Sequence, residues 1–286
     1  MRHYIKLMRV HHYIKNLLVF AALACSGQIF RLDKLLIGTA GFLAFCMTAS
    51  VVYIVNDIQD RERDRLHPTK CRRPIASGTV SVGRAKLLGF VLAVLALVFN
   101  GVTGHRSAGL LLILYLLLNL GYSCGLKNIP LVDVAILVAG FLIRMLYGAL
   151  ITGVEISNWL YLTVFSMALY FAFGKRRNEL RNLSGKETRK VLEEYSLGFL
   201  DKSMYMCLTL ANVFYVLWTM DEATIAFYNT RWLTLTAPIV LLISLRYSID
   251  IEGESDGDPV EVLLHDRILL GLVIPYLLLM FWFLYL

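Results

Sequence analysis

Charged residues are scarce in this chain of 286 residues. Only 17% of its residues are Asp, Glu, Lys or Arg, whereas 58% are hydrophobic. Soluble globular domains carry about 25% charged residues. A soluble fold would leave a large apolar surface in water, so the composition predicts an integral membrane protein instead.

Cysteine is also scarce, and its placement argues against two common kinds of site. The five cysteines include no Cys-x-x-Cys pair, and their number is odd. A disulfide framework uses cysteines in pairs, and zinc sites use closely spaced ones. Neither is indicated, so we expect these cysteines to be packing or lipid-facing residues.

The hydrophobic residues form nine continuous runs, each near the ~20 residues that a helix needs to cross a bilayer. These runs are 16–32, 34–56, 84–103, 107–123, 131–152, 157–174, 203–220, 231–248 and 267–286. Continuous apolar runs favour helices over the alternating strands of a barrel. We therefore expect an all-α polytopic bundle, a single membrane domain over residues 1–286, with two four-helix units plus one helix.

Lysine and arginine are concentrated at the N-terminus and in alternate loops between these runs. By the positive-inside rule these segments face the cytoplasm, so we expect the N-terminus inside a bacterial plasma membrane. The basic start could also belong to a signal peptide, but its length and the many later runs favour an uncleaved helix. Topology and headgroup contacts explain most of the basic residues behind the net charge of +7, and we expect the remainder to hold a phosphorylated substrate. No nucleic-acid partner is predicted.

The densest polar stretch follows the second apolar run and contains the pattern Asn56-Asp57-x-x-Asp60-x-x-x-Asp64. If this segment is helical, the three aspartates occupy positions i, i+3 and i+7 and share one face. Clustered carboxylates repel one another unless a cation joins them, and Mg²⁺ binds one or two carboxylates together with substrate phosphates. Asp57, Asp60 and Asp64 are therefore the candidate metal ligands and catalytic residues, and Asn56 is a candidate for substrate binding.

A basic segment follows directly. Pro68 and Pro74 interrupt helical structure, so a structured loop is expected over residues 67–81. This loop carries three cations, Lys70, Arg72 and Arg73. Guanidinium groups can bind phosphate through two parallel hydrogen bonds, although the same charges could serve topology alone. The nearby acidic residues favour a phosphate-binding site on a cytoplasmic face.

Four further polar residues are candidates for substrate binding: Lys15, Tyr122, Lys127 and Asp133. Lys15 starts the first run and either turns into a cytoplasmic cavity or snorkels to the membrane surface. Arg144 lies deep in the fifth run, where a charge is a functional hypothesis by default, yet it too could snorkel outward. Both alternatives stay open for each residue.

A second charged loop follows the sixth run and is mainly basic. It contains Lys175, Arg176 and Arg177, and no aspartate occurs between Lys175 and Phe199. This composition favours a phosphate group over a second metal cluster. We expect two cytoplasmic polar loops, 57–83 and 174–202, to form the rim of the active site. A third cytoplasmic loop, 249–266, is acidic and lacks the EF-hand pattern, so we expect it to pair with the basic loops.

The pattern from Asn56 to Asp64 resembles the NDxxDxxxD signature of the UbiA superfamily of membrane prenyltransferases, and the resemblance covers essentially the whole chain. Other segments resemble the decaprenyl-phosphate phosphoribosyltransferase branch: His67-Pro68-Thr69-Lys70-x-Arg72-Arg73-Pro74, Lys15-Asn16, Gly174-Lys175-Arg176 and Asp258-Pro259-Val-Glu261. Aromatic prenyltransferases of the superfamily carry a second aspartate-rich motif after the sixth span. This chain has the Lys/Arg cluster there, which supports the choice of branch.

The resemblance implies a Mg²⁺-dependent membrane glycosyltransferase that contributes to cell wall biosynthesis. Its substrates would be phosphoribosyl diphosphate and a polyprenyl phosphate lipid, and 5-phosphoribose would be transferred with release of pyrophosphate. Two other functions stay open: transfer of a polyprenyl group from its diphosphate to an aromatic or other acceptor, and lipid transport. A homo-oligomer is a further open alternative.

Overall fold

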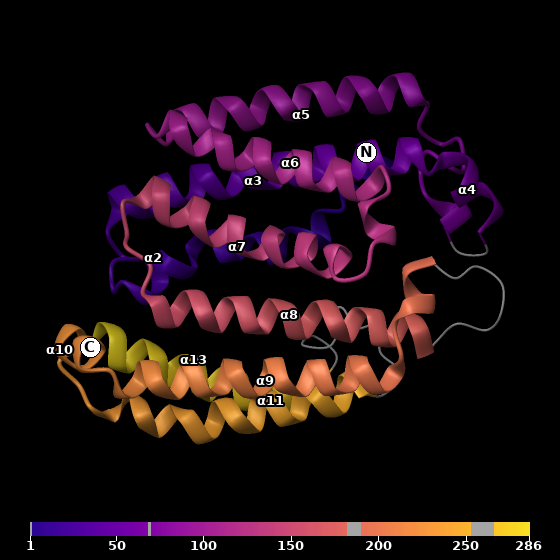
Figure 1. The fold of residues 1–286 in the computed structure, drawn as a ribbon. Coiled ribbons are helices and arrows are strands. Elements are labelled where there is room, and N and C mark those ends of the chain that lie inside the picture. The colour runs from indigo at the N-terminus through magenta and orange to yellow at the C-terminus, as the bar shows by residue number, and fades with distance from the viewer. Residues whose placement is uncertain (1, 68–69, 182–189, 253–265) are drawn as a thin grey trace. The chain divides into compact units, whose positions relative to one another are not determined.

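The computed structural model describes residues 2–67, 70–181, 190–252 and 266–286. Every regular element within these ranges is a helix (Figure 1). The chain divides into two compact units: unit 1 is Met1–Leu126 with Ile143–Glu155, and unit 2 is Lys127–Leu142 with Ile156–Leu286. The division falls inside one long helix, α7 (Val132–Thr152), whose first half belongs to unit 2 and whose second half belongs to unit 1.

Unit 1 begins with three short helical pieces, α1 (Arg2–Met8), η1 (Val10–Phe20) and α2 (Ala21–Cys25). The middle piece is a 3₁₀ helix, which has three residues per turn, so every third side chain lies on one face. Tyr13, Asn16 and Val19 occupy that face. Asn16 and Val19 are buried, and the Tyr13 hydroxyl lies 2.8 Å from Ser50 Oγ. The N-terminal segment therefore lies along the next helix with one fixed face.

That next helix, α3 (Leu32–Gln59), is the centre of unit 1. It packs against η1, α5 (Val82–Val102) and α6 (Gly109–Ser123) (Figure 1). Small residues are frequent on its buried side, which lets neighbouring helices approach closely: Gly38, Ala40, Gly41, Ala44, Ala49 and Ser50. The remaining elements of unit 1 are α4 (Arg61–Leu66), η2 (Lys70–Arg72) and η3 (Arg106–Ala108).

Unit 2 contains the first half of α7 and a set of further helices: η4 (Leu126–Asn128) at its boundary, α8 (Asn158–Arg181), η5 (Lys190–Glu194), α9 (Leu197–Met220), α10 (Glu222–Tyr228), η6 (Trp232–Thr236), α11 (Ala237–Glu252) and α13 (Arg267–Tyr285). The helices α8 and α9 pack along each other (Figure 1). The core of unit 2 includes the fully buried Tyr170, Val191 and Leu200. In contrast, α13 buries only Leu269 and leaves its other apolar side chains partly or fully exposed, as a lipid-facing helix requires.

Seven of the helices in the described ranges are long and apolar enough to cross a membrane: α3, α5, η3 with α6, α7, α9, η6 with α11, and α13. The protein is thus a polytopic all-α membrane protein, as predicted. Two of the expected runs differ from the helices that the structure shows. The run 16–32 is replaced by a shorter apolar stretch, Val10–Cys25, and the run 157–174 lies in α8, which continues into a charged end. The count of nine spans therefore stays a prediction.

A glycine marks the closest approach between the N-terminal segment and α7 in unit 1. A Cβ atom at Gly148 would lie 1.8 Å from the backbone carbonyl oxygen of Val19. Backbone atoms cannot rotate away as a side chain can, so α7 and η1 reach this separation only with glycine at that position.

We expect Gly148→Ala to lower the free energy of unfolding by about 1–3 kcal/mol, the usual cost of overpacking. Gly101→Ala on α5 is the matched control, because a Cβ there meets nothing within 4 Å and alanine is the better helix former. Thermal unfolding of the purified variants in detergent measures both. Equal unfolding midpoints for the two variants would contradict the close contact.

Candidate active site

Two aspartates of the acidic motif meet at a single arginine in unit 1. Arg73 Nη1 donates to Asp64 Oδ2 at 2.7 Å and to Asp57 Oδ1 at 3.3 Å. Both aspartates are buried, with 3% of each residue exposed. The acidic motif and the basic loop that follows it therefore form one charged group of residues.

A second arginine, Arg9, joins this group and was not predicted from the sequence. Its Nη2 donates to Asp57 Oδ1 at 2.7 Å, and its guanidinium carbon lies 4.8 Å from the centre of the Tyr53 ring. Its backbone is left-handed, with φ 52° and ψ 49°, a conformation that costs an L-residue about 1–2 kcal/mol. We call Arg9, Asp57, Asp64 and Arg73 the acidic cluster. In the sequence, Arg9 is one of several basic N-terminal residues that topology alone explains.

The third aspartate of the motif, Asp60, lies outside the acidic cluster. Its side chain is 35% exposed, and its ion-pair partner is Arg63 at 3.8 Å. The helix α3 ends at Gln59, so the three aspartates do not share one helical face as predicted. Within the described ranges, no three His, Cys, Asp or Glu side chains are grouped so that they could hold a metal ion. Guanidinium groups neutralise two of the carboxylates instead.

The other candidates of unit 1 lie on neighbouring elements. Asn56 is held by α6, where Ser123 Oγ donates to Asn56 Oδ1 at 2.6 Å. Tyr122 precedes that serine and is half-buried, as is Lys15 on η1. Lys70 and Arg72 are exposed on η2. Of these candidates, Asp57 and Asp64 are both joined to Arg73 by ion pairs, and the role of the others in a site stays a prediction.

Arg144 lies inside unit 1 and does not snorkel to the membrane surface. Only 7% of it is exposed. Its Nε donates to Asn16 Oδ1 at 2.8 Å and its Nη2 donates to Tyr115 OH at 3.0 Å. The guanidinium also lies over the rings of Phe45 and Tyr115. Arg144 thus ties the N-terminal segment to α6 and α7, and the snorkelling alternative is wrong.

Two predicted site residues of unit 2 pair with each other. Arg176 is fully buried, and its Nε donates to Asp133 Oδ2, while its Nη1 donates to Glu179 Oε2 at 2.7 Å. The Tyr195 hydroxyl donates to Asp133 Oδ1 at 2.8 Å and accepts from the Leu131 backbone N–H at 2.7 Å. Burial raises the pKa of Tyr195 to about 12, so the phenol keeps its proton at neutral pH and can donate to the carboxylate.

The remaining cations of the second polar loop differ in their surroundings. Arg177 Nε donates to Asp201 Oδ1 on α9 at 2.5 Å, and Arg177 Nη1 is buried without a hydrogen-bond partner among the described residues. Lys175 is exposed on α8, and Lys127 is half-buried on η4. Residues 182–189 of this loop lie outside the described ranges.

The acidic loop 249–266 is described only at its two ends, so Asp258 and Glu261 lie outside the described residues. Arg246 on α11 joins those ends, with its Nε 2.5 Å from Asp266 Oδ2 and its Nη2 3.7 Å from Asp250 Oδ1. The hydrogen bond from Arg246 lowers the pKa of Asp266 to about 2. Pairing of this loop with the basic loops stays a prediction.

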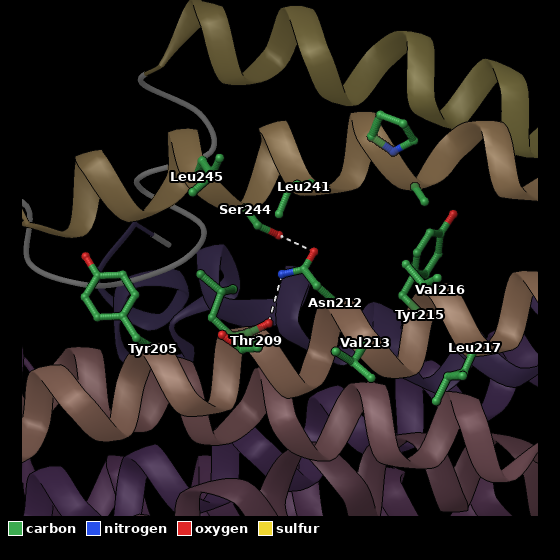
Figure 2. A pocket seen from close by; sticks show the side chains of 13 residues that line it. Tyr205, Thr209, Asn212, Val213, Tyr215, Val216, Leu217, Leu241, Ser244 and Leu245 are labelled. Atoms are coloured by element: carbon green, nitrogen blue, oxygen red, sulfur yellow. Dashed lines mark hydrogen bonds between the residues drawn. The ribbon is translucent and has the colours of Figure 1, made fainter.

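A separate pocket of about 560 Å³ lies between α9 and α11 in unit 2 (Figure 2). Its described lining is mainly apolar and includes no charged residue. Among its polar residues is Asn212, whose Nδ2 donates to Leu208 O at 2.8 Å and whose Oδ1 accepts from Ser244 Oγ at 3.2 Å (Figure 2). No predicted site residue lines this pocket, and its described lining contains no cation to pair with a phosphate.

The hydroxyl of Tyr195 supports a mutational test of the unit 2 ion pair. We expect Tyr195→Phe to lower the free energy of unfolding by about 1–3 kcal/mol, because the buried Asp133 carboxylate loses a donor. Tyr161→Phe on α8 is the control, since Tyr161 is 38% exposed. Chemical unfolding in detergent compares the two. Equal stabilities would show that the hydroxyl does not hold this ion pair together.

Comparison with known proteins agrees with the resemblance seen in the acidic motif. The sequence model of the UbiA prenyltransferase family matches residues 17–259. Two similar proteins are decaprenyl-phosphate phosphoribosyltransferases: the one from Mycolicibacterium smegmatis is 35% identical over 277 residues, 93% of this chain and 87% of that protein. The one from Corynebacterium glutamicum is 34% identical over 280 residues, 95% of this chain and 83% of that protein.

The fold is also similar to a solved structure. A UbiA homologue from Archaeoglobus fulgidus bound to GPP and Mg²⁺ superposes with a TM-score of 0.72 at 20% identity, over 97% of this chain and 99% of that one. The family match spans most of the chain, and the two relatives cover nearly all of it. The chain therefore belongs to the UbiA prenyltransferase family.

Proposed function

We propose that the protein transfers 5-phosphoribose from phosphoribosyl diphosphate to a polyprenyl phosphate and releases pyrophosphate. The observation that carries this proposal is the 35% identity, over 93% of the chain, to a relative named decaprenyl-phosphate phosphoribosyltransferase. The acidic cluster supports it, because carboxylates and guanidinium groups together suit a metal-bound diphosphate.

The donor groups of the acidic cluster fit Mg²⁺. Asp57 and Asp64 both contact Arg73 Nη1, so their carboxylates can face a single cation. We propose these two residues as metal ligands, with Asp60 as a third and Asn56 beside them. Mg²⁺ supplies charge stabilisation for the departing pyrophosphate. The fold neighbour bound to Mg²⁺ supports a divalent cofactor.

The chemistry of the transfer explains why the site is rich in cations. Loss of pyrophosphate from the anomeric carbon builds negative charge on the leaving group, which positioned cations stabilise. We propose that Arg73, with Lys70 and Arg72 on the same loop, binds the diphosphate. The acceptor phosphate is already anionic, so its oxygen forms the new bond to the anomeric carbon as the bond to pyrophosphate breaks. This step needs no general base.

The second polar loop is proposed to hold the other phosphate group. Lys175 and Arg177 flank Arg176, which is fully buried against Asp133. We propose that this buried pair positions the end of α8, while Lys175 and Arg177 bind the sugar phosphate or the acceptor phosphate. Tyr122, Lys127 and Lys15 are proposed as additional substrate contacts. The distribution of basic residues supports a cytoplasmic site in a bacterial plasma membrane, with the N-terminus inside.

The alternative is transfer of a prenyl group from a polyprenyl diphosphate to an aromatic or other acceptor. The fold neighbour bound to GPP favours it. The sequence between Lys175 and Phe199 is mainly basic and contains no aspartate. This favours phosphoribosyl transfer, because the aromatic prenyltransferases of the superfamily carry a second aspartate-rich motif there.

An assay of purified protein separates the two reactions. Radiolabelled phosphoribosyl diphosphate, polyprenyl phosphate and Mg²⁺ should yield labelled lipid and an equal amount of pyrophosphate, and a chelator should stop both. Turnover of a prenyl diphosphate without any labelled lipid would overturn the proposal. Movement of lipid across vesicles without release of pyrophosphate would indicate a transporter instead.

The metal assignment predicts the effect of single substitutions. Asp57→Asn and Asp64→Asn should each lower turnover by roughly 10²-fold or more, the usual effect of removing one charge-stabilising group from an active site. Asp33→Asn is the control, because Asp33 pairs with Arg31 and is exposed at the other end of α3. Near-normal turnover in both cluster variants, with the fold intact, would remove the metal assignment.

A further inference from the structure

We propose that Arg9 and Arg73 make metal binding at the acidic cluster conditional on a diphosphate anion. In the resting protein these arginines act as internal counterions of the two buried aspartates, and the incoming diphosphate draws them away so that the carboxylates can take the metal. The inference rests on the proposed function only in that the substrate carries a diphosphate.

The acidic cluster is already neutral without any ligand. Two carboxylates, Asp57 and Asp64, face two guanidinium groups across contacts of 2.7, 2.7 and 3.3 Å. Asp57 Oδ1 is shared by both arginines. A bare divalent ion would add two positive charges to this neutral group and would have to displace guanidinium groups from buried carboxylates. Charges separated by a few ångströms interact strongly where water is largely excluded, so this step is unfavourable.

A diphosphate makes metal binding more favourable, because its negative charge offsets the positive charge that the metal adds. Guanidinium groups bind phosphate oxygens through strong, paired hydrogen bonds. Arg9 and Arg73 can therefore exchange carboxylate oxygens for phosphate oxygens, and the carboxylates then become available to the metal. Each ligand relieves the charge that opposes the other, so metal and anion must bind with positive coupling, and the coupling is reciprocal.

Arg9 is well placed for this exchange. Its side chain is 22% exposed, so the guanidinium reaches solvent without leaving a packed core. The residue lies between α1 and η1, in a left-handed conformation that separates the two helices. Its side chain lies over the Tyr53 ring, which can stabilise the cation while its carboxylate partner changes.

Binding of Mn²⁺ and of radiolabelled pyrophosphate tests the proposal without any turnover. The full-length protein in nanodiscs is titrated with Mn²⁺ alone, with bound metal measured by electron paramagnetic resonance. Labelled pyrophosphate is titrated by equilibrium dialysis, once with a chelator and once with Mn²⁺. The double variant Asp57→Asn/Asp64→Asn gives the background level of Mn²⁺ and pyrophosphate binding. Because Mn²⁺ and pyrophosphate also associate in solution, variants are compared at identical concentrations.

The informative variant is Arg9→Asn, because asparagine tolerates a left-handed backbone and carries no charge. It should bind Mn²⁺ alone roughly tenfold more tightly than the wild type, and Mn²⁺ should enhance its pyrophosphate binding roughly tenfold less, changes within the usual range of coupled sites. Arg31→Asn removes a charge from an exposed pair at the far end of α3 and should behave as the wild type. Arg9→Lys should keep most of the coupling.

Arg73→Gln is the second variant, should Arg9→Asn fail to fold, and it too should tighten the binding of Mn²⁺ alone. Unchanged or weaker Mn²⁺ binding in these variants, or coupling equal to that of the wild type, would overturn the proposal. A failure of the proposed function can be distinguished from a failure of this inference. A protein that makes no labelled lipid but shows this coupling would still have conditional metal binding, with a different diphosphate as its donor.

Discussion

A charge inside a helical membrane bundle has to be neutralised or hydrogen-bonded, because lipid offers no partner. Each polar cluster of this protein satisfies that constraint in its own way. Asp57 and Asp64 are neutralised by Arg9 and Arg73, and Asp133 is neutralised by Arg176. Arg144 is held by neutral groups, with hydrogen bonds to an amide and a phenol and two aromatic rings beneath its guanidinium. Compensation of charge therefore decides which side chains meet in both units.

The N-terminal segment shows how local geometry serves that constraint in unit 1. Three residues per turn place Tyr13, Asn16 and Val19 in one row, so a single 3₁₀ helix contacts α3, Arg144 and the backbone beside Gly148. Arg9, the residue before this 3₁₀ helix, has a left-handed backbone, and its side chain donates to Asp57. A regular α-helix would spread the row around the helix axis and lose these simultaneous contacts.

Much of the fold could be predicted from hydrophobic runs alone, because length and continuity decide membrane spans. The acidic motif and the basic loop after it also made Asp57, Asp64 and Arg73 candidates, and the structure joins these three by ion pairs. Arg9 and Tyr195 escaped prediction because their partners lie 48 and 62 residues away along the chain, and no local pattern reports such pairs. The three-aspartate face failed for a different reason: α3 ends at Gln59, and spacing arguments hold only within a continuous helix.

Counting cations in the sequence overstated what the second polar loop can offer a substrate. Arg176 is fully buried and committed to Asp133 and Glu179, so it serves the fold of unit 2. The same reasoning applies to the acidic cluster, where two of the cations are committed to aspartates in the resting protein. Under the proposed function, attraction of an anionic substrate begins at the exposed Lys70 and Arg72, and strong binding follows the release of Arg9 and Arg73. Affinity for the diphosphate is in this way tied to metal occupancy, because the same arginines control both.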